Sequence, residues 1–212
     1  MNRNTIAITV LALLTTVILF AGNWYQDIVT ITDSLILPVT QRYITVSASA
    51  AGVGNTAPTP TTIGTYRGLM FDADAELAFV NKEVPDDFSG AGDLAFRIYW
   101  CAQSGDLIQN TETVVFDIEW RSVNYDNAGE TYDQGTVASD SSTYTATGEQ
   151  TDKECFESII ALPYTGGNQP IAAGDIIGIK FNRDITTDTY TGGVTVIRFE
   201  ISYPSVGVPN HF

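Results

Sequence analysis

ETVVFDIEWRS, at residues 112–122, alternates large apolar residues with charged residues over most of its length. Successive side chains of a β-strand point to opposite faces, so this pattern predicts a strand with one buried face and one solvent-exposed face. We expect the buried face to carry Val114, Phe116, Ile118 and Trp120, and the exposed face to carry Asp117, Glu119 and Arg121.

The same alternation recurs outward from this segment in both directions. LAFRIYWCA at residues 94–102 and VTVIRFEISY at residues 194–203 follow it closely. The residues expected on their apolar, inward faces are Leu94, Phe96, Ile98 and Trp100 in the first run, and Ile197, Phe199, Ile201 and Tyr203 in the second. Shorter apolar runs lie at residues 66–72, 75–80, 154–163 and 176–184, and one or two weaker strands fit within residues 124–152. With roughly eight strands and loops of unequal length, residues 66–212 are predicted to form an all-β domain, an antiparallel β-sandwich with a single jelly roll. The order of Cys and Trp residues does not fit an immunoglobulin-type domain.

Residues 1–22 form a hydrophobic segment in front of this domain. Its core, TIAITVLALLTTVILFAG, is uncharged and long enough to cross about 30 Å of hydrocarbon as a helix. Three interpretations stay open, namely a retained transmembrane anchor, a cleaved secretory signal and an apolar helix buried in an assembly. The poor cleavage pattern and the aromatic residues that follow favour the retained helix. The residues expected to contact a membrane or neighbouring chains are Ile6, Leu11, Leu14, Ile18, Phe20, Trp24 and Tyr25.

Residues 23–65 are predicted to form an arm and a linker between that segment and the sandwich. Residues 23–41 fit either a helix ended by Pro38 or a strand rich in Ile, Val and Thr, and residues 42–49 fit a short strand. Residues 51–65, AGVGNTAPTPTTIGT, lack hydrophobic periodicity and are expected to be an exposed linker. An apolar arm held away from its own core is expected to pack against another copy or a lipid layer.

Charge and cysteine usage restrict the partners and the compartment. The chain has 25 Asp and Glu residues against 10 Lys and Arg residues, for a formal net charge of −15. An acidic surface repels phosphate groups, so we expect no nucleic-acid partner. Cys101 and Cys155 both lie in strand-like runs and are a disulfide candidate if the domain is outside a membrane, with two buried thiols as the alternative. The single histidine, His211, leaves no Cys/His cluster for zinc.

Catalytic motifs are absent from the sequence. It holds no nucleophile elbow, P-loop or dinucleotide-binding motif, and no acid–base pair stands out. We therefore predict no catalytic and no cofactor-binding residue, and we do not expect an enzyme. Calcium is the most credible ligand, because Asp184 and Asp188 lie in a loop rich in oxygen donors, but the absence of an EF-hand spacing favours a solvated acidic loop.

Two further features of the loops bear on the site. The sequence before residue 176 predicts a turn in which Gly174 takes a positive φ and Asp175 accepts backbone N–H groups. Arg183 and Asp184, with Asp188 and Gly192 after them, are expected to form either a charged clamp across a loop or an ordinary turn. Tyrosines in loop-like stretches are candidates for contacts with partners or sugars, or for caps on the sandwich edges; these are Tyr125, Tyr132, Tyr144, Tyr164 and Tyr190.

Two segments carry a resemblance to a known family. LAFRIYWCAQSGDLIQNTETVVFDIEWRSVN and IAAGDIIGIKFNRDITTDTYTGGVTVIRFEISY together resemble the small jelly-roll-like β-sandwich domain of phage and viral structural and fibre-like proteins, over residues 93–203. The family does not usually open with a hydrophobic helix, so residues 1–50 depart from it. The matching residues are Trp100, Ala102, Gly105, Trp120, Gly174, Asp175, Arg183, Asp184, Asp188, Thr189, Gly192 and Tyr203.

The resemblance implies a non-enzymatic structural protein of a virion, a capsid, spike or fibre subunit that assembles as a homo-oligomer. Two alternatives stay open. One is a subunit of a prokaryotic cell-surface filament joined by N-terminal strand exchange, and the other is a membrane-anchored carbohydrate-binding module. The expected partners are copies of the chain, a lipid membrane or other virion proteins, and a glycan receptor. The expected location is a virion or cell surface, with membrane association through the N-terminus.

Overall fold

The computed structural model describes residues 28–30, 36–73, 75–90, 92–103, 105, 107–124, 138–148, 154–164 and 171–206. The chain divides into two units, Met1–Thr40 with Val206–Phe212, and Gln41–Ser205. In the first unit, strand β1 (Ile28–Thr30) pairs antiparallel with the start of β2 (Ile36–Ser47). The predicted hydrophobic helix, with its expected contact residues, lies outside the described residues. Within the described ranges, no helix is long and apolar enough to span a membrane.

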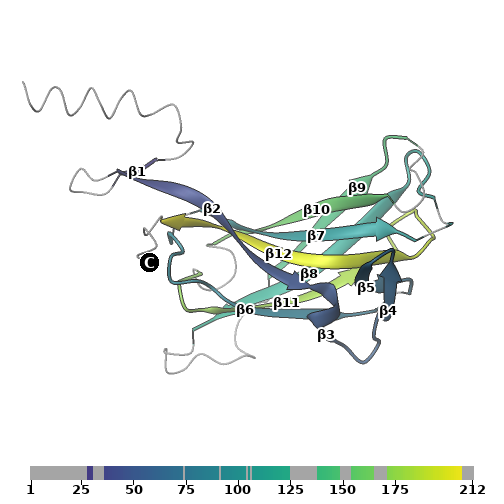
Figure 1. Cartoon of the computed structure of the whole chain (residues 1–212), viewed down its shortest axis with the longest axis horizontal. Coiled ribbons are helices and arrows are strands. Elements are labelled where there is room, and N and C mark those ends of the chain that lie inside the picture. The colour runs from purple at the N-terminus through teal and green to yellow at the C-terminus, as the bar shows by residue number, and fades with distance from the viewer. Residues whose placement is uncertain are drawn as a thin grey trace, which may run out of the picture. The chain divides into compact units, whose positions relative to one another are not determined.

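The second unit is built on eight consecutive strands that begin at Tyr66, where the sequence predicted the sandwich to begin. They are β5 (Tyr66–Phe71), β6 (Ala78–Glu83), β7 (Leu94–Ala102), β8 (Thr113–Val123), β9 (Ala138–Thr145), β10 (Cys155–Leu162), β11 (Ile176–Arg183) and β12 (Val194–Val206). One sheet has the order β5-β12-β7-β10 and the other β6-β11-β8-β9, all antiparallel. This arrangement is a jelly roll, which confirms the predicted fold class (Figure 1).

Residues 41–65 belong to the same unit, which corrects the expected linker. Strand β3 (Gly52–Val53) pairs with β6, and β4 (Thr59–Ile63) forms a hairpin with β5. Gly64 has a φ of 58°, which the two-residue turn of this hairpin requires. The Gly, Pro and Thr residues that suggested a linker are instead typical of short strands at a sheet edge, where proline is tolerated. The expected boundary at residue 65 therefore lies inside the unit, which begins at Gln41.

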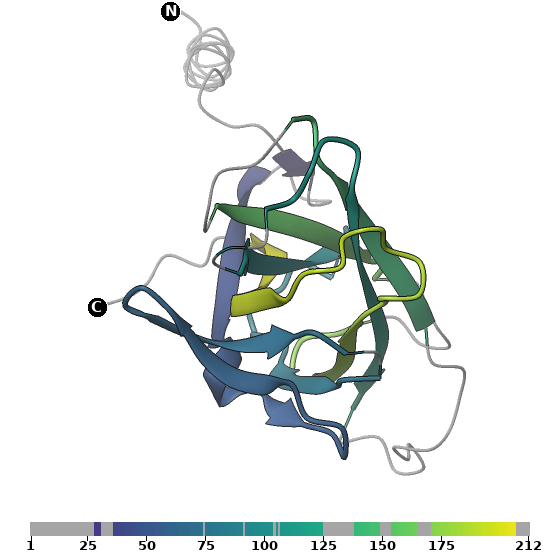
Figure 2. The same ribbon diagram turned by 90° about the vertical axis from the view of Figure 1, so that its right-hand side faces the viewer.

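The two sheets face each other (Figure 2). The core between them is rich in aromatic side chains. The inward faces are those that the alternation predicted, since Phe116 and Trp120 on β8 and Phe96 and Trp100 on β7 are all buried. Phe181 on β11 is at the centre, and its ring centroid lies between 5.1 and 6.3 Å from those of four other phenylalanines. Such clusters of rings contribute more than their buried area alone.

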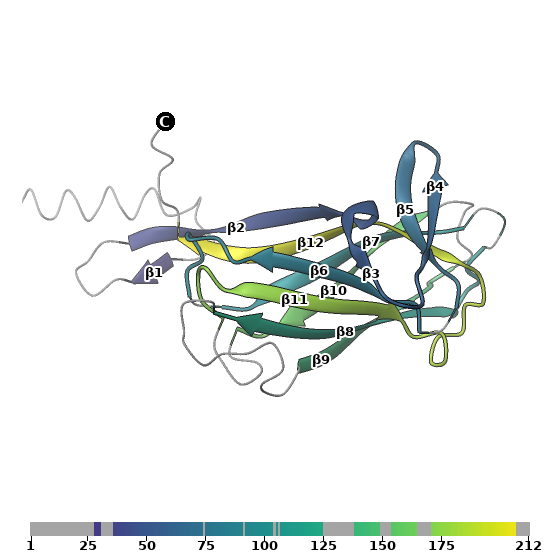
Figure 3. The same cartoon turned by 90° about the horizontal axis from the view of Figure 1, so that it is seen from below.

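In the first sheet, strand β12 neighbours β2, β5 and β7 (Figure 3). It pairs with β7 over residues 194–202, with β5 over residues 194–196 only, and also neighbours β2. Because a strand has two edges, β5 and β2 must share the edge opposite β7. A β-bulge lies between Val196 and Arg198. Ile197, predicted to face the core, is therefore at the bulge and only half-buried, because the extra residue shifts the alternation by one position.

Candidate functional site

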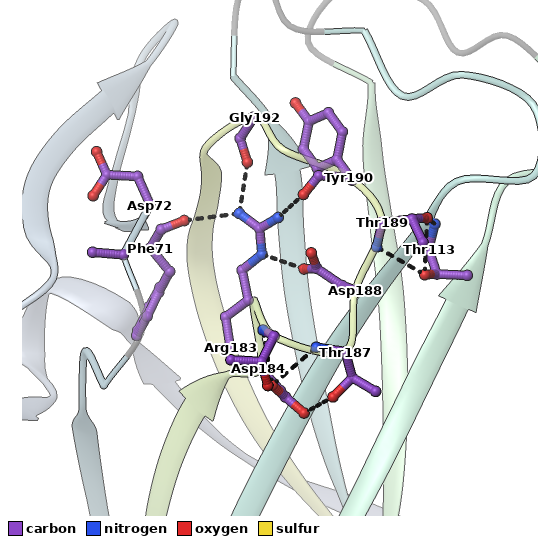
Figure 4. A network of polar contacts seen from close by, with 12 residues as sticks. Phe71, Asp72, Thr113, Arg183, Asp184, Thr187, Asp188, Thr189, Tyr190 and Gly192 are labelled. Atoms are coloured by element: carbon purple, nitrogen blue, oxygen red, sulfur yellow. Dashed lines mark hydrogen bonds and ion pairs between the residues drawn. The ribbon is translucent and has the colours of Figure 1, made fainter.

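Arg183, the last residue of β11, is the hub of a polar network inside the sandwich (Figure 4). Its Nε donates to Asp188 Oδ2 at 2.7 Å, and its Nη1 donates to the carbonyl oxygens of Phe71 at 3.1 Å and Gly192 at 2.6 Å. Its Nη2 donates to the carbonyl oxygen of Tyr190, and the guanidinium lies over the Tyr190 ring at 5.4 Å. Both charged side chains are 1% exposed. The network joins the end of β5 to the loop that connects β11 and β12.

The predicted charged clamp is therefore present for Arg183, Asp188 and Gly192, and Asp184 takes the turn role beside it. The Asp184 carboxylate accepts hydrogen bonds from the backbone N–H groups and the hydroxyl groups of Thr186 and Thr187. The two carboxylates expected as calcium ligands are thus bound by internal donors. No group of three or more Asp, Glu, His or Cys side chains in the described part of the chain is placed to hold a metal ion.

Other buried polar groups also hold loops in place. Asp175 accepts from the Ser122 hydroxyl and from the Ala172 backbone N–H, both at 2.8 Å. Gly174 has a φ of 83°, so the turn predicted from these residues is confirmed. The indole Nε1 of Trp100 donates to Ser158 Oγ at 3.0 Å inside the core.

A second anchored loop contains Asp87, after β6. Its carboxylate accepts from the hydroxyls of Tyr203 at 3.1 Å and Ser205 at 2.6 Å, and it lies 2.9 Å from the Arg42 guanidinium. Burial acts to raise the pKa of this carboxyl, but the two hydroxyl groups and Arg42 together hold it below its ordinary value. The loop is thereby fixed to the last part of β12.

The two cysteines lie opposite each other on β7 and β10. Cys155 is the register partner of Cys101, and the two sulfur atoms form a disulfide with an S–S distance of 2.00 Å. The bond that the sequence left open against two free thiols is therefore present. It joins segments that are 54 residues apart in the chain.

The outer face of the first sheet carries what we call the charged stripe, which consists of Arg97, Tyr99, Glu157, Arg198 and Glu200. Arg97 Nη1 lies 2.7 Å from Glu157 Oε1, and Arg198 Nη2 lies 3.5 Å from Glu200 Oε2. The Arg198 guanidinium is 4.0 Å from the centroid of the Tyr99 ring. The hydrogen bond from Arg97 lowers the pKa of the Glu157 carboxyl, although burial opposes this. The charges within the stripe balance one another.

Next to the stripe is a groove of about 600 Å³ at the bulge of β12, where the strand has β2 and β5 on one side. We call it the β12 groove. It is lined by Thr45, Ser47, Ser49, Thr65, Tyr66, Arg67, Tyr99, Ile197 and Arg198. Tyr66 is 64% exposed, the highest value among the exposed large hydrophobic residues of the described chain. Arg67 is also exposed and has no ion-pair partner within the described residues.

The tyrosines predicted as contact residues have a different role. Tyr190 is buried, Tyr144 packs against Trp100 with ring centroids 5.3 Å apart, and Tyr164 packs against the core. Tyr125 and Tyr132 lie outside the described residues. The three described rings cap the core, which was the alternative for them. The groove was missed because it arises from a bulge and from the pairing of strands far apart in the sequence, which no local pattern records.

No family model matches the sequence, and no curated protein matches it. The CBM36-1 domain of a multidomain xylanase from the hindgut metagenome of Trinervitermes trinervoides has a TM-score of 0.41 at 12% identity, over 79% of this chain and 100% of that one.

Two other solved structures show similarity at the same low level. The insecticidal delta-endotoxin Cry8Ea1 from Bacillus thuringiensis has a TM-score of 0.36 at 16% identity, over 79% of this chain and 24% of the toxin. A chain of infectious bursal disease virus, Gx strain, has a TM-score of 0.33 at 9% identity, over 85% of this chain and 37% of that one. At these scores the similarities assign neither a family nor a function.

Proposed function

We propose that this chain is a non-enzymatic structural protein of a virion, a capsid, spike or fibre subunit that assembles with copies of itself. The observation that carries the proposal is how the described chain uses its buried charge. Arg183 donates to the Asp188 carboxylate and to backbone carbonyl groups, and Asp87 and Asp175 fix neighbouring loops. Polar networks whose donors and acceptors are satisfied in this way hold the loops at the ends of the jelly roll in one arrangement, which suits a subunit that packs against neighbours.

The disulfide supports the proposed location. Such bonds persist in oxidising surroundings, which include virion and cell surfaces. The bond between Cys101 and Cys155 fits a domain exposed outside a membrane. In this proposal residues 1–22 attach the domain to a lipid membrane or to other virion proteins, and the sandwich faces the medium.

The alternative of N-terminal strand exchange makes a different structural prediction. It requires residues 28–49 to pair with another chain. In the structure β2 neighbours β12 of its own chain, and Val46 and Ala48 at its end are buried in the core of the same unit. This observation favours association between complete sandwiches over exchange of β2.

Purified native particles test the proposal directly. Quantitative mass spectrometry of the particles should show this chain as a major component, and cross-linking should join the sandwich domains of different copies. The proposal is wrong if the chain is absent from purified particles. It is equally wrong if light scattering finds only monomers of the full-length protein at every concentration and ionic strength.

A further inference from the structure

We propose that the β12 groove binds an acidic saccharide, a sugar that carries a carboxylate, and that Arg67 and Arg198 hold the carboxylate while Tyr66 packs against the ring. The site adds a glycan ligand to the structural role proposed above, and it does not depend on that role. It is assigned by charge, by the chemistry of the lining and by the shape of the sheet at the bulge.

The charge argument starts from the scarcity of cations in this chain. Five described cations form ion pairs with carboxylates, and these are Arg42, Arg97, Lys180, Arg183 and Arg198. Arg67 has no such partner among the described residues, yet it lies exposed at the groove in a chain with a net charge of −15. A guanidinium presents its N–H groups in a planar fork that matches a carboxylate in two parallel hydrogen bonds.

Arg198 also lines the groove and is positioned to take part. Its guanidinium lies 4.0 Å from the Tyr99 ring centroid and 3.5 Å from an oxygen of Glu200. The side chain is 44% exposed, so N–H groups remain for a ligand. Stacking on Tyr99 fixes the plane of the guanidinium in advance, which lowers the entropy lost on binding.

The remainder of the lining suits a sugar better than an acidic peptide. Four hydroxyl side chains line the groove, and two of them, Ser47 and Ser49, are hydrogen bonded to each other at 2.8 Å. Hydroxyl groups donate and accept, as the hydroxyl groups of a sugar require. Ile197 is the only aliphatic side chain of the lining, whereas a bound peptide needs apolar pockets for its anchoring side chains. The exposed ring of Tyr66 offers an apolar face with a polar tip.

The β12 groove continues into a second hollow. A second groove of about 630 Å³ adjoins it and shares Ser49 and Arg67 with it. Its other lining residues are Pro60, Thr61, Thr62 and Gly68, again rich in hydroxyl groups. Arg67 thus stands between two hollows, so a carboxylate bound to it can have further sugar units on either side.

Isothermal titration calorimetry on the full-length chain tests the proposal, in a detergent whose headgroup is not a sugar. The probes are 3′-sialyllactose and a galacturonic acid trisaccharide, which present carboxylates on two kinds of sugar, and lactose is the neutral control. We expect saturable binding of at least one acidic probe and none of lactose. Arg67→Gln should weaken binding about tenfold or more, and raising the salt concentration should weaken it further.

Matched variants separate recognition from general charge. Tyr66→Phe keeps the ring and should bind nearly as the wild type does, whereas Tyr66→Ala should bind several-fold more weakly. Lys180→Gln removes a cation from the outer face of the other sheet and should leave the affinity unchanged. Circular dichroism of each variant confirms folding, which these exposed positions are not expected to disturb.

Three results would overturn the proposal. One is the absence of saturable binding of both acidic probes up to about 10 mM, where any useful affinity would show. Another is equal binding by the wild type and the combined variant Arg67→Gln with Arg198→Gln. The third is self-association of the full-length chain that Arg67→Gln abolishes, because the groove would then hold an acidic segment of a second copy. Each of these is distinct from the presence or absence of the chain in particles.

Discussion

Arg183 Nε lies 2.7 Å from Asp188 Oδ2, and each side chain is only 1% exposed. The same strand carries a second ion pair of opposite character. Lys180 Nζ lies 3.1 Å from Glu119 Oε2, and those side chains are 35% and 48% exposed. Asp188 and Glu119 both pair with cations of β11 and differ mainly in burial. Their substitutions can therefore be compared to measure the effect of burial on stability.

Asp188→Asn should destabilise the domain far more than Glu119→Gln. Removing one partner of a buried pair leaves the other charge without compensation in the core, at a cost of roughly 3–5 kcal/mol. The exposed pair is screened by solvent, and its loss should change the free energy of unfolding by less than about 1 kcal/mol. Urea unfolding followed by tryptophan fluorescence measures both. Similar midpoints for the two variants would show that the Arg183 network does not hold the loops.

Two truncations should show whether residues 41–50 belong to the sandwich. Deleting residues 1–40 should leave a folded sandwich, since the second unit begins at Gln41. Deleting residues 1–50 also removes β2 from β12 and takes the buried Val46 and Ala48 out of the core, which should cost more than about 2 kcal/mol. Thermal melts by circular dichroism compare the two proteins. Equal stability would mean that β2 is dispensable and that residues 41–50 belong to the arm expected from the sequence.

Removing the disulfide should lower stability without changing the fold. The double variant Cys101→Ala with Cys155→Ala opens a bond between residues 54 apart in the chain, which should cost roughly 2–4 kcal/mol. The wild type in a strong reductant should approach the variant in its unfolding midpoint. A variant that matches the oxidised wild type would show that the bond does not form in the native protein.

Acid should weaken the contact between β7 and β10 through Glu157. Its pKa is lowered in the folded protein, first by the hydrogen bond from Arg97, so the folded state binds fewer protons than the unfolded state near the ordinary glutamate pKa. The stabilisation is therefore complete above that pKa and is lost as the pH falls through the lowered one. Glu157→Gln should show a smaller loss of thermal stability between about pH 5 and pH 3 than the wild type.

A control separates this effect from the general loss of negative charge. Glu83→Gln removes an exposed carboxylate of β6 that has no ion pair in the described residues. Its melting temperature should follow the wild-type profile over the same pH range. If the two variants shift the profile equally, net charge and not the Arg97 contact sets the acid response.

The strands were predictable because each buried face repeats with a period of two. Phe116 and Trp120 could be assigned to the core from residues 112–122 alone. The jelly roll followed from the number and spacing of such runs. Ile197 was assigned to the wrong face because a bulge leaves no signature in local alternation. Strands β3 and β4 were not predicted, because their glycine, proline and threonine residues also occur in linkers.

The polar sites were predictable only in part. Arg183 and Asp188 are close in sequence, so a clamp between them could be suggested, but their complete burial depends on Phe71, more than a hundred residues away. The β12 groove unites residues of β2, β5, β7 and β12, which meet only once the sheet has formed. Sites of that kind are a product of topology, and a single sequence does not encode them in any one stretch.

The central position of β12 also sets the order of events during synthesis. It is the last strand of the roll, yet it lies between β5 and β7, and β2 borders it as well. Until β12 leaves the ribosome, no strand joins β5 to β7. The edges of these two strands therefore stay open to other nascent chains. The first sheet therefore closes after translation of the roll, and stopping the chain before residue 194 would leave separate strand pairs in place of a sheet.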